Sequence, residues 1–99
     1  MNIRAMQESE PDNPALTRYV DIAELLCACQ FSSREAAFDG LIQLLQQWTD
    51  EMKLPSLSVL GVEENDFELI IANCRGSSMK TNPIVLSDQQ IRSLLQTRL

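Results

Sequence analysis

The chain has 99 residues, enough for one domain with a hydrophobic core and too few for two. Apolar residues account for 44% of the sequence, whereas only 5% are aromatic and three are glycine, and this composition favours helices over a sheet-rich fold. The formal net charge is −6 and there is no basic cluster. These charges argue against nucleic acid and anionic membranes as partners, because both are bound through cationic side chains.

Hydropathy along the chain predicts a cytoplasmic protein. The opening residues, MNIRAMQESEPDN, contain no apolar stretch like that of a secretory signal. No apolar run approaches the roughly 20 residues that span a bilayer. The three cysteines, Cys27, Cys29 and Cys74, are odd in number, and no histidine is present to complete a zinc site. We expect them to be small buried thiols in a reducing compartment.

The first quarter of the chain predicts an irregular entry segment followed by a helix. Residues 1–12 are polar and broken by Pro11. Asn13 and Pro14 predict the helix start, because asparagine caps free amides and proline suits the first helical position. One apolar row then recurs at helical spacing: Leu16, Tyr19, Val20, Ala23, Leu26 and Cys27. A second apolar row lies beside it: Ile22, Leu25 and Cys29. A helix with two apolar rows needs more than one neighbour to cover it.

The longest helix is expected from Ser32 to about Lys53. Ser32 and Glu35 have the spacing of a capping box, in which each side chain bonds the other residue's backbone amide. The apolar stripe that follows is Phe38, Leu41, Ile42, Leu45, Trp48 and Met52. We expect this stripe to face the core along its whole length.

The region after the long helix predicts a turn and a shorter helix. Pro55 begins a helical turn through Leu60, and Gly61 ends it. Acidic residues at 63–66 begin the next helix, because carboxylates favour a helix N-terminus. Its expected buried stripe is Phe67, Ile70, Ile71 and Cys74. Residues 76–78 end that helix.

A last capped helix completes the predicted fold. Asn82 is pushed out of helical geometry by Pro83, and Ser87 with Gln90 forms a second capping box. The inward face is expected to be Ile91, Leu94 and Leu95. No alternating strand pattern and no repeat is present. These patterns predict an all-α fold, a small helical bundle of about four to five helices in a single domain over residues 1–99.

Few side chains suggest chemistry. The usual nucleophiles need a neighbouring base, and neither Lys53 nor Lys80 belongs to a recognised motif that would replace histidine. Carboxylates that are adjacent in sequence, such as Glu63 and Glu64, point to different faces of a helix. The segment SSMKTNP, residues 77–83, is the one place where polar residues and a cation converge between two helices. It is either a loop whose serines cap carbonyls or a binding segment.

The ordered set of these segments resembles the C-terminal end of the iron-containing (type III, metal-dependent) alcohol dehydrogenases. The matching segments are RYVDIAELL, a long helix, LPSLSVLGV, an acidic helix start, and SSMKTNPI followed by a capped helix. The resemblance covers the chain from Asn2 to Leu99. It implies an all-α chain like the far part of that family's C-terminal helical domain.

The resemblance also implies what this chain would lack. The family's dinucleotide-binding domain, with its glycine-rich pyrophosphate loop, and the segment with an aspartate and three histidines as metal ligands have no counterpart here. No catalytic, cofactor-binding or metal-ligating residue is therefore expected. The parent family uses NAD(P) and iron or zinc to interconvert alcohols and carbonyls. By the same match, Ser78, Met79 and Lys80 would line the substrate cleft of an intact enzyme, and Asn82 would shape the adjacent turn.

Two interpretations of function follow, and the sequence also leaves open a third, a small enzyme with its own site. In the first, the chain is the C-terminal helical fragment of such a dehydrogenase, inactive alone, with the missing dinucleotide-binding part as its partner. Its uncovered apolar helix faces would then allow self-association. In the second, it is a stand-alone helical protein-interaction module. The row Ile22, Leu25 and Cys29 distinguishes them, because a module would bury this row internally or against a defined partner.

Overall fold

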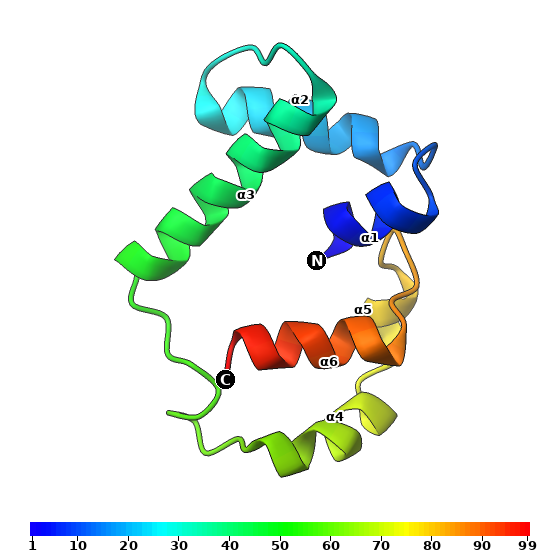
Figure 1. Ribbon diagram of the computed structural model, residues 1–99, viewed down its shortest axis with the longest axis vertical. Coiled ribbons are helices and arrows are strands. Elements are labelled where there is room, and N and C mark those ends of the chain that lie inside the picture. Colours follow the sequence, from blue (N-terminus) through cyan, green and yellow to red (C-terminus); the bar gives the residue numbers. More distant parts are fainter. The chain divides into compact units, whose positions relative to one another are not determined.

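A computed structural model describes residues 1–99 and is helical throughout, with 64% of residues in helices and no strand. The predicted all-α class is confirmed. Six α-helices and one 3₁₀-helix (η1) are present, more than the four to five expected (Figure 1). Their bounds are α1 Asn2–Ser9, α2 Ala15–Cys27, α3 Arg34–Glu51, η1 Glu64–Asp66, α4 Phe67–Asn73, α5 Ser77–Lys80 and α6 Asp88–Thr97.

The residues of the chain form two compact units. The terminal unit consists of residues 1–5 and 55–99, so it joins the two ends of the sequence. The hairpin unit consists of residues 6–54 and contains α2 and α3. Each unit is described by itself.

Helix α1 occupies the segment for which an irregular entry was expected. Ile3, Ala5 and Met6 are almost completely buried, with exposed fractions of 6%, 1% and 0%. Ile3 and Met6 are three residues apart, the spacing that places two side chains on one helix face. The prediction over residues 1–12 was wrong because the four apolar residues of this polar segment were too few to indicate a periodic face, although the burial of three of them stabilises a helix.

The hairpin unit begins with the cap that the sequence predicted. The Ala15 amide donates to Asn13 Oδ1 at 3.0 Å, and Pro14 has helical angles, with φ −63° and ψ −19°. At the other end of α2, Ala28 adopts the left-handed conformation with φ 54°. Its amide donates to the Glu24 carbonyl, so one of the last carbonyls of α2 has a partner.

Helix α3 is capped one residue later than predicted. Ser33, in extended geometry, accepts a hydrogen bond from the Ala36 amide at 3.1 Å, so the cap is Ser33 and not Ser32. The helix ends at Glu51, before Lys53. Lys53 is left-handed, with φ 51°, and the Leu54 amide donates back to the Thr49 carbonyl at 3.2 Å. Pro55 excludes Leu54 from helical geometry, which explains the early end.

Only the first half of the predicted α3 stripe is buried. Phe38 and Leu41 are each 2% exposed, and in α2, which α3 contacts, Leu16 and Ala23 are likewise buried. The second half of the stripe is open: Leu45, Trp48 and Met52 are 46%, 37% and 62% exposed. Within this unit the second half of α3 leads away from α2, so α2 does not cover it (Figure 1).

The terminal unit is built around α4 and α6, which lie side by side (Figure 1). Its buried side chains come from the start of α1, from α4 and α6 and from the connection between these two helices: Ile3, Ala5, Phe67, Ile71, Ile84, Leu86 and Ile91. The capping box predicted for α6 is confirmed, since the Gln90 amide donates to Ser87 Oγ and the Ser87 amide donates to Gln90 Oε1. Leu94, expected to face inward, is 40% exposed.

Two local predictions in the terminal unit are corrected. Residues 55–60 form no helix, although Gly61 ends a turn as expected, with φ 86° and the Val62 amide donating to the Leu57 carbonyl at 3.0 Å. This turn is held instead by the end of the chain, where the Arg98 carbonyl accepts from the Leu57 amide at 2.7 Å. Helix α4 ends at Asn73, and residues 77–80, expected as a loop, form the short helix α5.

Candidate functional site

The four residues that the sequence singled out lie on and just after α5, in the terminal unit. Ser78 and Lys80 are exposed, whereas Met79 and Asn82 are half-buried. The single turn of α5 is held by bonds from the Met79 and Lys80 amides to the Gly76 carbonyl, at 3.1 and 3.2 Å. A hollow in the terminal unit lies on α6, and none of these four residues lines it.

Asn82 is engaged by its own surroundings. Its side-chain amide pairs reciprocally with that of Asn2: Asn2 Nδ2 donates to Asn82 Oδ1 at 2.6 Å, and Asn82 Nδ2 donates to Asn2 Oδ1 at 3.0 Å. Asn82 Nδ2 also donates to the Ile84 carbonyl at 2.8 Å. These bonds tie the start of α1 to the turn before Pro83, so Asn82 contributes a structural link between the two ends of the chain.

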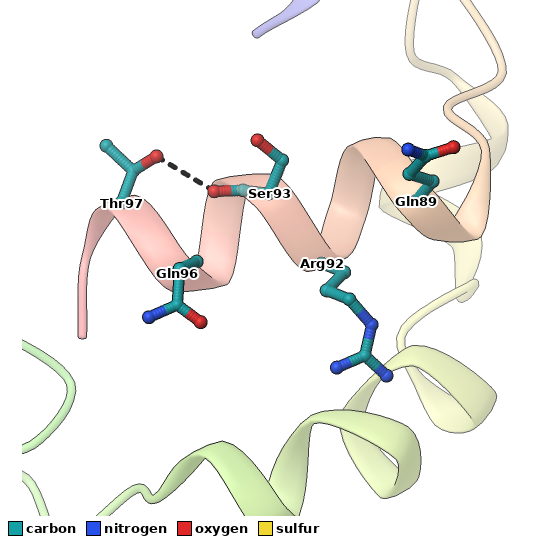
Figure 2. A pocket seen from close by; sticks show the side chains of 5 residues that line it. All are labelled: Gln89, Arg92, Ser93, Gln96 and Thr97. Atoms are coloured by element: carbon teal, nitrogen blue, oxygen red, sulfur yellow. Dashed lines mark hydrogen bonds between the residues drawn. The ribbon is translucent and has the colours of Figure 1, made fainter.

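The hollow on α6 has a volume of about 370 Å³ and is lined from one helix alone. Figure 2 shows the five side chains along it: Gln89, Arg92, Ser93, Gln96 and Thr97. Thr97 Oγ1 donates to the Ser93 carbonyl at 2.8 Å, and Arg92 forms an ion pair with Glu68 of α4. The Thr97 hydroxyl and the Arg92 guanidinium therefore already have partners, and the α6 sequence pattern gave no signal for a site here.

The hairpin unit has a second hollow, of about 390 Å³, where the end of α2 meets the middle of α3. Its lining is mostly sulfur, apolar and amide groups: Leu26, Cys27, Cys29, Phe31, Gly40, Gln43, Leu44 and Gln47. The expectation of buried thiols was wrong, because Cys27 and Cys74 are half-buried and Cys29 is exposed, and all three are unbridged. Cys27 and Cys29 are separated by one residue, a C-x-C pair, but nothing in the sequence indicates that this pair lines a cavity.

The residues present do not fit the metal centre of the family that the sequence resembles. No three side chains of histidine, cysteine, aspartate or glutamate converge in a group that could hold a metal ion. The sequence also has no histidine to supply the nitrogen ligands of such a centre. None of the helices is both long and apolar enough to cross a bilayer.

Comparisons with known proteins found no match to this chain. No protein-family profile, no curated protein and no solved structure matches this chain. The family resemblance therefore depends on the quoted segments alone.

Proposed function

We propose that this chain is the C-terminal helical part of an iron-containing alcohol dehydrogenase. The parent enzyme would interconvert alcohols and carbonyls with NAD(P), and this part would form a helical wall beside the catalytic cleft. The observation that carries the proposal is the order of elements. Each resembling segment falls on a separate element in the expected sequence: α2, α3, the turn closed by Gly61, the acidic start at η1, and the Asn-Pro turn before α6.

Exposed apolar side chains on α2 and α3 support the same proposal. Ile22 and Leu25 are 42% and 78% exposed, and Leu45 and Met52 are 46% and 62% exposed. Apolar surface of this extent usually has a cover in the functional state. In the proposed parent, the cover would be the missing dinucleotide-binding and metal-ligating part, which would supply both the nicotinamide and the metal that hydride transfer needs.

The test is complementation. The dinucleotide-binding and metal-ligating part of an iron-containing alcohol dehydrogenase, deleted for its own last helices, would be produced with and without this chain. We expect alcohol-dependent reduction of NAD⁺ or NADP⁺ only when both parts are present, and none from the 99-residue chain alone. A matched control replaces Phe38, 2% exposed, with aspartate, which should abolish rescue by unfolding the hairpin unit.

Two results would refute this proposal. One is activity of the purified chain by itself. The other is failure of complementation together with an upstream DNA sequence that encodes no in-frame glycine-rich loop and no histidine ligands. The second result would favour a stand-alone interaction module, whose docking face would be the same exposed row, Ile22, Leu25 and Cys29.

A further inference from the structure

The C-x-C pair of the hairpin unit has a chemistry that the proposed dehydrogenase does not use. Cys27 is the last residue of α2, and Cys29 follows the left-handed Ala28. Both thiols are free, and both line the 390 Å³ hollow beside α3. Two residues apart, their Cα atoms are within about 7 Å of each other in any backbone conformation. The fold therefore presents two accessible sulfur atoms to one small volume.

The composition of the hollow selects among possible ligands. Its lining contains no lysine, arginine or histidine and no carboxylate, so the two thiols are its only strong metal donors. Two donors are too few for zinc, which takes four. Thiolate sulfur is a soft ligand, and Cu(I) is the soft first-row cation that such ligands prefer. Cu(I), a d¹⁰ monovalent ion, is also stable with only two ligands. Both the number and the type of the donors in the hollow therefore suit Cu(I).

We propose that Cys27 and Cys29 form a two-thiolate site for Cu(I). Each thiol releases one proton to solvent, and each sulfur donates a lone pair to the ion, which keeps its oxidation state. The complex of one Cu(I) and two thiolates carries one negative charge. Leu26, Phe31 and Leu44 line the same hollow and supply no further metal donor.

The proposal makes the third cysteine a matched control. Cys74 is half-buried, like Cys27, but lies in the terminal unit, where its Sγ–H donates to the Ile71 carbonyl at 3.5 Å. Cys74→Ser therefore removes a thiol of similar exposure without touching the hollow. Cys29→Ser is the variant least able to disturb folding, because Cys29 is exposed and lies beyond the end of α2.

The experiment is an anaerobic titration with Cu(I) against a chromogenic Cu(I) chelator, at a protein concentration where the chain is monomeric. We expect one Cu(I) per chain in the wild type and in Cys74→Ser, and an affinity at least 100-fold lower in Cys27→Ser, Cys29→Ser and the double variant. Raising the pH by one unit should strengthen binding, because protons are released. X-ray absorption should show two sulfur ligands.

Several outcomes would overturn the site. These are equal binding by the Cys29→Ser variant, loss of binding in Cys74→Ser, and copper that binds only by joining two chains. Circular dichroism of each variant distinguishes lost ligands from lost helices. Because no alcohol or nicotinamide enters the assay, its failure would leave the dehydrogenase proposal unaffected, and the reverse is also true.

Discussion

At the scale of single residues, Gly40 shows how a side chain from a loop can decide the identity of a helical position. Gly40 lies inside α3, where glycine costs about 1 kcal/mol relative to alanine. A Cβ atom at this position would lie 2.7 Å from two ring atoms of Phe31. Glycine is therefore explained by the close approach of the Phe31 ring, which the loop between α2 and α3 folds over the helix.

We predict opposite outcomes for Gly40→Ala in two backgrounds. In Phe31→Ala, where the ring is gone, Gly40→Ala should raise the free energy of unfolding by about 1 kcal/mol, because only the helix preference remains. In the wild type this gain should be cancelled or reversed, because the ring must move. Urea unfolding of the four proteins in the cycle measures the coupling. An identical effect of Gly40→Ala in both backgrounds would show that the ring does not restrict this position.

The residue scale also explains two left-handed residues at helix ends that the sequence did not predict. Gly61 was expected as a terminator because glycine adopts positive φ without strain, and it does so here. Ala28 and Lys53 take the same left-handed conformation, although neither residue type favours it. Their geometry comes from the chain around them: a short connection must follow α2, and Pro55 prevents Leu54 from continuing α3. Such a cause is not visible in the residue itself.

At the scale of elements, the two serines before α3 provide a matched pair. Ser33 accepts from the Ala36 amide at 3.1 Å, whereas Ser32 has the spacing of a capping box but does not cap. We predict that Ser33→Ala lowers the free energy of unfolding by about 1 kcal/mol. Ser32→Ala should change it by less than about 0.5 kcal/mol, as expected for an exposed residue away from a cap. Thermal or urea unfolding measures both changes. A larger loss of unfolding free energy in Ser32→Ala than in Ser33→Ala would show that Ser32 is the cap, as the sequence predicted.

Element types were predicted better than their boundaries and their covered faces. The helices at α2, α3, α4 and α6 follow from apolar residues recurring at helical spacing, and the Asn13 and Ser87 caps follow from side-chain chemistry. Helices α1 and α5 were missed because each is short and has few apolar residues. Periodicity identifies which residues share a face but does not say how far a neighbour covers it. This is why Leu45 and Leu94 are more exposed than predicted.

The candidate site was less predictable than the fold. The segment of Ser78, Met79, Lys80 and Asn82 was chosen by resemblance, and the structure adds that Asn82 pairs with Asn2 across 80 positions of sequence. No local pattern indicates a partner so distant. The hollow beside Cys27 and Cys29 likewise depends on where α3 passes the end of α2. In both cases a contact between segments remote in sequence defines the surroundings of the side chain.

At the scale of the whole molecule, the apolar row of α2 should control association. Leu25 is 78% exposed and lies beside Ile22, which is 42% exposed, on the α2 face that α3 leaves uncovered. Burying a leucine side chain is favourable by about 1.5–3 kcal/mol. In a two-fold symmetric dimer each side chain is buried in both copies, so its contribution to the free energy of association is doubled. We therefore predict reversible, concentration-dependent self-association of the isolated chain.

Two single substitutions test which surface is responsible. Leu25→Glu should raise the dimer dissociation constant at least tenfold, which corresponds to about 1.4 kcal/mol. Val85→Glu should have little effect, because Val85 is 82% exposed but belongs to the terminal unit and is not part of this row. Sedimentation velocity over a range of protein concentrations measures both constants.

Since the net charge of each copy is −6, added salt should strengthen the wild-type dimer by screening repulsion. A wild-type chain that stays monomeric at every concentration, or equal effects of the two substitutions, would show that this row is not the associating surface.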